Sequence, residues 1–353
     1  MNMTGSLIER LGIHHPIIQA PMAGGITEAG LVLAVSRTGC LGSIGAGYMP
    51  PEELSALILE VKKRTDLPYS VNLFIPEQTN ASPSEVQNAF EALRPLSEEL
   101  DVQENPPLST EQTNFFEEQL EIILREKVPV CSFTFGMPSK EAVHDLKKNG
   151  TFIIGTATSV MEAILLEEQG MDAIVAQGSE AGGHRGTFSG PPIHHMVGLM
   201  SLVPQICDFV RVPVIAAGGI MEARGYRAAL SLGAQGVQMG TAFLTTYESS
   251  AHPAYKEAVL NAREDQVVVT KAFSGKEARG IKNQFIYEME NETRILPYPL
   301  QNEATKKIRK AALEQNDAEF MSLWCGQSPR LSRSQSVQEL IQSILNESRE
   351  VTT

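Results

Sequence analysis

Eight short apolar runs of strand length, separated by helix-like segments, limit the folds open to this chain more than any other feature. The runs occupy residues 16–22, 41–47, 69–75, 128–135, 151–156, 173–178, 213–219 and 236–244. They are mostly apolar throughout rather than alternating, as in parallel strands that are covered on both faces. The segments between them carry helix-terminal signals, such as the prolines and acids that open 50–65 and the cations that close it. Eight such units predict an α/β fold, the (β/α)8 or TIM barrel, with a doubly wound open sheet as the alternative.

Two segments interrupt this alternation. Residues 77–110 are rich in Glu, Ser, Pro and Asn and predict an insertion after the third strand. From about residue 264 the pattern changes again, and it ends in two helical stretches near 303–316 and 335–348. We therefore expect a barrel domain at 1–263 and a C-terminal helical extension at 264–353 that packs on the barrel.

The charge and the cysteine content narrow the possible partners and the compartment. A net charge of −13 argues against a nucleic acid or an anionic membrane as the partner, because either would repel the chain. Four dispersed cysteines without a CxxC pair are typical of reduced thiols in a cytoplasmic protein. The first residues lack the apolar core of a secretion signal, and no uncharged apolar run reaches membrane-spanning length. We expect a cytoplasmic monomer or homodimer that acts on a small molecule.

Polar and glycine-rich motifs fall where the predicted strands end. They are QAPMAGG at 19–25, Asn72 in the third strand, QGSEAGGHRG at 177–186, AAGGI at 216–220 and QMGT at 238–241. In barrels of this kind, the carboxyl ends of the strands and the loops that follow them form the active site. The motifs therefore predict one shared site at that end of the barrel.

The last two motifs predict a phosphate-binding part of this site. Gly218 and Gly219 would let the backbone approach a ligand closely, while Gly240 and Thr241 offer backbone amides and a hydroxyl. The loops after strands seven and eight frequently hold phosphate groups in such barrels. The alternative is that these glycines only form tight turns between strand and helix.

Uncharged amides form a second group at the strand ends, namely Gln19, Asn72, Gln177 and Gln238. An amide both donates and accepts hydrogen bonds, which suits the mixed polar edge of a flavin ring. The alternative is that these side chains cap the ends of the strands.

His184 lies within the glycine-rich motif after the sixth strand. An imidazole changes charge near neutral pH, so His184 is a candidate general base or hydrogen-bond donor, with a solvated loop histidine as the alternative. The pairs His14–His15 and His194–His195 have no carboxylate at a recognisable spacing, and adjacent side chains on a strand point to opposite faces. We therefore expect no metal site.

Together these motifs resemble the nitronate monooxygenase family, formerly called 2-nitropropane dioxygenases, in its class I form. The resemblance runs from QAPMAGG through SVNLF, QGSEAGGHRG, VPVIAAGGI and GAQGVQMGTAFL to FSGKEARGIKNQF, LPYPLQN and LWCGQ, and so covers nearly the whole chain. It implies a TIM barrel with non-covalently bound FMN, in which the flavin reacts with O2. The implied substrate is an alkyl nitronate such as propionate 3-nitronate, which is oxidised to an aldehyde or oxo acid with release of nitrite.

The resemblance also implies roles for individual residues. His184 matches the catalytic histidine that takes the α-proton from a neutral nitroalkane, and Tyr298 matches a tyrosine near the substrate. Arg185, beside this base, is a candidate source of positive potential for an anionic substrate, with a solvated loop cation as the alternative. The residues expected at the FMN are Pro21, Met22, Asn72, Gln177, Gly182, Gly218, Gly219, Gln238, Met239, Gly240 and Thr241.

Other functions stay open at this point. The flavin-dependent enoyl-ACP reductases share the EAGGH-type loop but use NADPH, and an NAD(P)H:quinone reductase is a further alternative. The glycines of LGSIGAG at 41–47 do not match the GxGxxG dinucleotide fingerprint. A non-catalytic flavin-binding protein would keep the glycine loops without needing His184.

Overall fold

A closed barrel of parallel strands is the centre of the molecule. The computed structural model describes residues 5–102, 114–190 and 196–350. Eight strands form one sheet in the order β1-β9-β8-β6-β5-β4-β3-β2, and a parallel bridge between Ile18 and Leu41 joins its two ends. This closure confirms the TIM barrel and excludes the open sheet. The strands are β1 (Ile17–Gln19), β2 (Gly42–Gly45), β3 (Tyr69–Phe74), β4 (Val130–Thr134), β5 (Phe152–Ala157), β6 (Ala173–Gln177), β8 (Val214–Ala217) and β9 (Gly236–Met239).

Helices cover the outside of the barrel because each presents an apolar face to the sheet. In α3, for example, acids in the first turn and cations in the last turn match the helix dipole, while Leu54, Ile58 and Val61 are fully buried in the barrel core. The helices of this layer are α2 (Ala29–Arg37), α3 (Pro51–Arg64), α5 (Phe116–Arg125), α6 (Lys140–Lys148), α7 (Val160–Gln169), α8 (Leu199–Phe209), α9 (Ala223–Ser231) and α15 (Val337–Glu350).

The amino-terminal end of the barrel is filled by side chains. The short helix α1 (Leu7–Leu11) buries Leu7 and Leu11 in a cluster with inward residues of the strands, including Phe152 and Ile215. The barrel interior is therefore packed at this end, and any ligand must enter at the opposite, carboxyl end.

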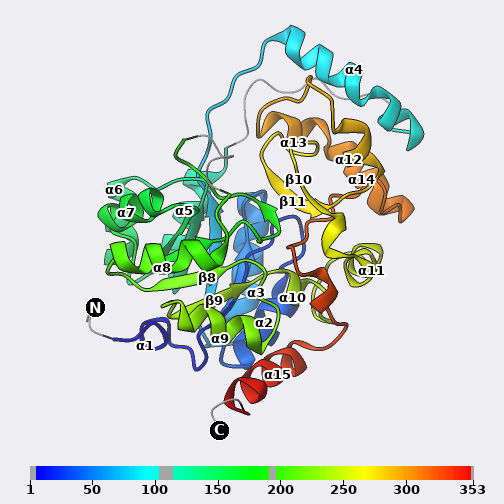
Figure 1. Ribbon diagram of the computed structural model, residues 1–353. Helices are drawn as coiled ribbons and strands as arrows, with labels where there is room; N and C mark the ends of the chain where they lie inside the picture. Colours follow the sequence, from blue (N-terminus) through cyan, green and yellow to red (C-terminus); the bar gives the residue numbers. More distant parts are fainter. Residues whose placement is uncertain (1–4, 103–113, 191–195, 351–353) are drawn as a thin grey trace.

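A second hydrophobic core lies beside the carboxyl end of the barrel. It contains residues from both sides of the domain boundary that the sequence predicts after residue 263. It joins α4, from the insertion at 77–110, to α11 and to the C-terminal extension; residues 103–110 of that insertion lie outside the described residues. Figure 1 shows α4 beside α12, α13 and α14. We call this part the upper unit. It comprises α4 (Pro83–Glu99), α11 (Pro253–Asn261), the 3-10 turn η2 (Glu264–Gln266), α12 (Gln284–Met289), α13 (Leu300–Ala304), α14 (Lys306–Gln315) and the sheet β10 (Val267–Thr270), β11 (Ala278–Ile281) and β7 (Gly183–His184).

The last helix leaves the upper unit and returns to the barrel. After the 3-10 turn η3 (Pro329–Leu331), α15 packs against α9 and α2 and buries Val337, Leu340, Ile341 and Ile344 in the barrel core (Figure 1). The predicted C-terminal extension therefore divides in two, because its final amphipathic helix completes the outer layer of the barrel.

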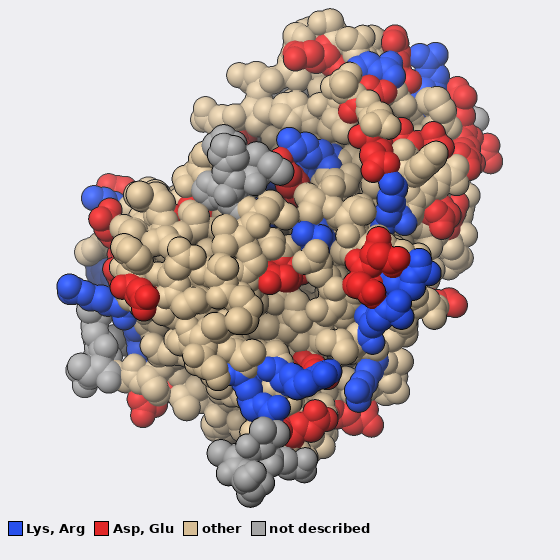
Figure 2. All heavy atoms as spheres, viewed as in Figure 1, with Lys and Arg blue, Asp and Glu red and all other residues tan. Residues whose placement is uncertain are grey.

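The visible surface carries charges of both signs. Figure 2 shows Lys and Arg side chains next to Asp and Glu side chains. Ion pairs between exposed or half-buried side chains include Arg263 with Asp265 at 3.0 Å and Lys282 with Glu290 at 2.6 Å. This face is therefore mixed in charge, unlike the continuous basic surface that binds nucleic acids. None of the described helices is both long and apolar enough to cross a membrane.

Candidate active site

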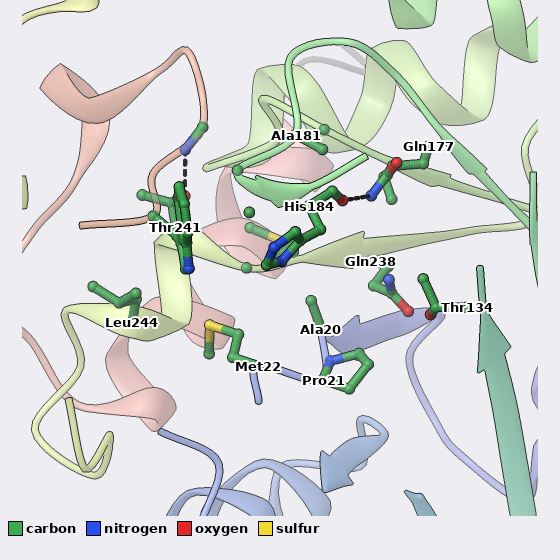
Figure 3. Close-up of a pocket in the computed structure, with 18 of the residues that line it drawn as sticks. Ala20, Pro21, Met22, Thr134, Gln177, Ala181, His184, Gln238, Thr241 and Leu244 are labelled. Atoms are coloured by element: carbon green, nitrogen blue, oxygen red, sulfur yellow. Dashed lines mark hydrogen bonds between the residues drawn. The ribbon is translucent and has the colours of Figure 1, made fainter. Parts of the chain in front are cut away.

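One cavity at the carboxyl end of the barrel collects the motifs that the sequence distributes over the chain. The cavity, counted with the open space at its mouth, has a volume of about 1280 Å³. Its wall includes loops from the barrel together with Trp324, Gly326 and Ser328 from the C-terminal part. Every residue that was predicted to contact the cofactor lies on this wall, and so does His184. Figure 3 labels His184 together with Pro21, Met22, Gln177, Gln238 and Thr241. The predicted set is Pro21, Met22, Asn72, Gln177, Gly182, Gly218, Gly219, Gln238, Met239, Gly240 and Thr241.

The uncharged amides at the strand ends have different tasks. Gln19 is fully buried, and its Oε1 accepts a hydrogen bond from Ser43 N at 2.9 Å, so it links neighbouring strands as the capping alternative requires. Asn72 donates from Nδ2 to Ser132 Oγ at 2.9 Å on the cavity wall. Gln238 faces the cavity directly (Figure 3).

Gln177 holds the glycine-rich loop in place. Its Nε2 donates to His184 O at 3.1 Å, and its Oε1 accepts from Gly186 N at 2.8 Å. At the other end of the loop, Glu180 accepts from Leu199 N at 2.8 Å, at the start of α8. The loop is thus tied to the barrel at both ends and is not a mobile solvated segment.

The glycine at position 182 allows two backbones to touch. A Cβ atom there would lie 2.5 Å from Gly326 N and 2.6 Å from Cys325 C, which is closer than any side chain can approach. Hydrogen bonds from Gln327 N to Glu180 O and from Gly326 N to Thr241 Oγ1, both at 3.0 Å, fix the same contact. The C-terminal segment therefore closes one side of the cavity only because residue 182 has no side chain.

His184 stands on a two-residue strand rather than in an irregular loop. Its residue pairs with Ala278 across β7 and β11, and its Nε2 lies 2.8 Å from Ser274 Oγ. Its ring lies 6.0 Å from the ring of Phe135 and 5.4 Å from that of Trp324, centroid to centroid. Burial, together with nearby cations, lowers the pKa of His184 to about 3, so the imidazole is neutral at physiological pH.

The cations that act on His184 come from the upper unit. They are Lys276 and Arg309. The Lys276 ammonium forms an ion pair with Glu77 and lies 4.9 Å from the centre of the Phe135 ring. These residues make the surroundings of His184 unfavourable for a further positive charge and favourable for an anion.

Tyr298 lies behind the cavity wall instead of on it. Its ring is 5.9 Å from that of His184 and 5.5 Å from that of Phe135, and its side chain is hydrogen-bonded to that of Tyr48, which does line the cavity. Burial raises the pKa of both phenols, so both stay neutral and hydrogen-bonding. The structure thus places Tyr298 next to His184 and joins it to Tyr48, a residue of the cavity wall.

The structure places Arg185 differently from the sequence prediction. Its side chain is turned away from the cavity and is only 5% exposed, and its Nη1 donates to the carbonyl oxygens of Gln177 and Gly178 at 2.5 and 2.7 Å. Burial lowers the pKa of Arg185 to about 10, so it stays charged but serves the backbone of the loop. The positive potential beside His184 comes from Lys276 and Arg309 instead. Arg185 is therefore neither a solvated loop cation nor a residue that contacts the ligand, the two roles that the sequence suggested.

Several cavity residues escaped the sequence analysis. Thr134 ends β4 and Phe135 follows it. The strand pattern could have indicated both, because the other motifs lie at the corresponding ends of their strands. Trp324, Gly326 and Ser328 come from the C-terminal segment, and only the tertiary fold brings them to the wall.

The histidine pairs are remote from this site or not described. His14 and His15 precede β1 at the amino-terminal end of the barrel, with their rings 6.5 Å apart, and His194–His195 lies outside the described residues. Among the residues that the structure describes, no group of three or more His, Cys, Asp or Glu side chains could hold a metal ion.

Comparison with known proteins places this site in a family. The family model described as nitronate monooxygenase matches residues 6–347. A protein of Staphylococcus aureus strain Newman, named a probable nitronate monooxygenase, is 48% identical over 347 residues, which cover 98% of this chain and 97% of the relative. The chain belongs to the nitronate monooxygenase family.

Solved structures agree with membership of the nitronate monooxygenase family. A nitroalkane oxidase from Streptomyces ansochromogenes superposes with a TM-score of 0.91 at 34% identity, covering 98% of each chain. FabK from Thermotoga maritima is also 34% identical, but it superposes with a TM-score of only 0.77 over 98% of this chain and 97% of its own. The two neighbours are equally similar in sequence, and the backbone arrangement is closer to that of the nitroalkane oxidase.

Proposed function

We propose that this chain binds FMN and uses O2 to oxidise alkyl nitronates to an aldehyde or oxo acid with release of nitrite. Membership of the nitronate monooxygenase family supports the reaction class, and the structural neighbour named nitroalkane oxidase supports nitro compounds as substrates. One observation carries the proposal. A neutral imidazole, that of His184, stands on the wall of the cavity that is also lined by both glycine loops and by the amides Asn72, Gln177 and Gln238.

The residues present fit an FMN. Gly218 and Gly219 have φ angles of +135° and +65°, a conformation in which successive backbone N–H groups can converge on an anion such as a phosphate. Thr241 also lines the cavity, and Gln238 and Asn72 offer amides for the polar edge of a ring. When bound there, the flavin would supply the redox chemistry with O2.

The chain itself would supply proton transfer and charge. His184 would take the α-proton of a neutral nitroalkane, a step that a nitronate does not need because it has already lost that proton. As the proton leaves, negative charge develops on the nitro group, and Lys276 and Arg309 would stabilise that charge from the side of the upper unit.

We expect that lowering the pH from about 8 to about 5 does not reduce kcat/KM for nitroethane through protonation of His184. The pKa of His184 is lowered from 6.5 to about 3, so the neutral, proton-accepting form persists through that window and is lost only as the pH falls through about 3. Oxygen uptake with nitroethane and with ethylnitronate across this window measures the effect. A loss centred near 6.5 with nitroethane alone would mean that the imidazole is solvated.

We expect a nitronate, and not NADPH, to bleach the flavin of the anaerobic protein. The comparison is made by mixing the purified protein separately with each compound and following the flavin absorbance. The similarity to FabK makes the NAD(P)H-dependent reductases the second candidate, whereas the closer superposition favours the nitroalkane oxidase. Rapid, saturable reduction of the flavin by NADPH, with no reduction by the nitronate, would show that the protein is an NAD(P)H-dependent reductase.

The same preparation identifies the cofactor. Heat denaturation should release FMN, with its phosphate having been held by the loops at 216–220 and 238–241. Release of FAD, or failure of the protein to take up FMN, would refute this part of the proposal. A protein that binds FMN but is reduced by neither compound would be the non-catalytic flavin-binding alternative.

A further inference from the structure

Ser274 has a hydrogen-bond pattern that favours a hydrogen on one particular nitrogen of His184. The serine is only 1% exposed, and its Oγ lies 2.8 Å from His184 Nε2. Its hydroxyl donates to Lys276 O at 3.1 Å and accepts from Lys276 N at 3.3 Å. A hydroxyl has one hydrogen. When that hydrogen is on the bond to Lys276 O, Ser274 accepts from the imidazole, and Nε2 is the protonated nitrogen.

The aromatic neighbours of His184 do not make this choice by themselves. Phe135, Tyr298 and Trp324 surround the imidazole ring with centroid distances of 5.4 to 6.0 Å. These packing contacts depend on the shape of the ring and not on which of its atoms are nitrogens. A rotation of the ring by half a turn keeps that shape but would place the carbon Cε1 opposite Ser274 Oγ. The hydrogen bond from Nε2 to Ser274 therefore selects one of two orientations of similar shape.

We propose that Ser274 is a positioning residue for proton abstraction, and that it acts by holding Nε2 of His184 so that Nδ1 is the nitrogen that receives the α-proton. This inference rests on the proposed function and adds the atom and the residue that orients it. The α C–H bond breaks, its electron pair moves onto the nitro group to form the nitronate, and the proton ends on Nδ1. No further reactant is needed for this step.

The same hydrogen bond matters more once the proton has moved. The imidazolium that forms faces two cations, Lys276 and Arg309, with Glu77 offsetting the first and the neutral phenols of Tyr48 and Tyr298 nearby. A hydrogen bond from a charged donor is stronger than one from a neutral donor. Ser274 Oγ would therefore stabilise the protonated ring against the repulsion of its surroundings.

The test compares nitroethane with ethylnitronate in the FMN-loaded enzyme. Ser274→Ala should lower kcat/KM for nitroethane about 10- to 100-fold, the usual weight of a hydrogen bond to a charged group, and should change ethylnitronate oxidation far less. Ser274→Thr keeps the hydroxyl and should restore most of the ratio between the two substrates. The matched control is Ser97→Ala, which removes another buried serine hydroxyl of the upper unit, one that donates to Leu93 O at 3.1 Å within α4. It should leave that ratio unchanged.

A spectroscopic measurement shows directly which nitrogen of the His184 ring is protonated. In protein labelled with ¹⁵N-histidine, the His184 signals, identified by their loss in His184→Asn, should show a protonated Nε2 and a bare Nδ1; in Ser274→Ala this pattern should become mixed. Equal losses on both substrates, or an unaltered pattern of protonation in Ser274→Ala, would overturn the inference. A wild-type enzyme that oxidises neither substrate would instead refute the proposed function, so the two failures are distinguishable.

Discussion

His184→Asn should lower turnover of nitroethane by about 10²–10⁴-fold, the usual contribution of a positioned base, while ethylnitronate oxidation is largely kept. Asparagine retains a hydrogen-bonding side chain of similar reach but cannot take the proton. The nitronate has already lost that proton, so its oxidation needs only the binding site and the flavin. Oxygen uptake with each substrate at matched pH, beside the flavin spectrum, measures both effects.

The control for this change is His144→Asn, because His144 is exposed on α6. It should leave both activities and the FMN content unchanged. If His184→Asn loses both activities equally while FMN stays bound, His184 binds the anion or tunes the flavin and is not the base. Unaltered nitroethane turnover would mean that the imidazole has no part in the reaction.

The sequence predicts the barrel and most of the cavity wall because both depend on local patterns. Buried strands of a parallel sheet are apolar throughout, and polar or glycine residues at their carboxyl ends come together once the sheet closes. Asn72 and Gln238 lie near the ends of β3 and β9, and Gly219 follows β8. Each could be placed on the cavity wall from this position alone. The prediction that Arg185 faces the ligand beside His184 was wrong. Consecutive residues on a strand point in opposite directions, so the side chain of Arg185 points away from the cavity.

The partners of His184 could not be predicted in this way. Ser274 is 90 positions away along the chain, and it reaches the imidazole only because β11 pairs with β7. The helix α4 likewise shares a core with residues near 320 rather than with its neighbours in sequence. Such contacts depend on how the upper unit folds over the barrel. The hydrophobic periodicity of a single segment does not indicate which distant segment it will contact. The lowered pKa of His184 follows from the same contacts.

The contact between the glycine-rich loop and the C-terminal segment leads to the second large expected effect. Gly182→Ala should lower the free energy of unfolding by about 1–3 kcal/mol and should weaken FMN binding about tenfold or more. The added Cβ would lie 2.5 Å from Gly326 N, and backbone on both sides leaves no flexible side chain to give way. The two segments must separate, which breaks the bonds that join Gln327 to Glu180 and Gly326 to Thr241 and opens that side of the cavity.

Thermal unfolding and FMN titration of the reconstituted protein measure this change. The matched control is Gly150→Ala, at a glycine with φ +85° whose Cβ would meet nothing within 4 Å. That substitution strains the backbone, costing about 1 kcal/mol, but lies between α6 and β5, away from the cavity, so FMN affinity should not change. The comparison separates a general loss of stability from opening of the site. If Gly182→Ala binds FMN as tightly as the wild type, the C-terminal segment does not seal the cavity through this contact. The glycines of the motif would then need another explanation, namely the tight turn that brings His184 onto β7.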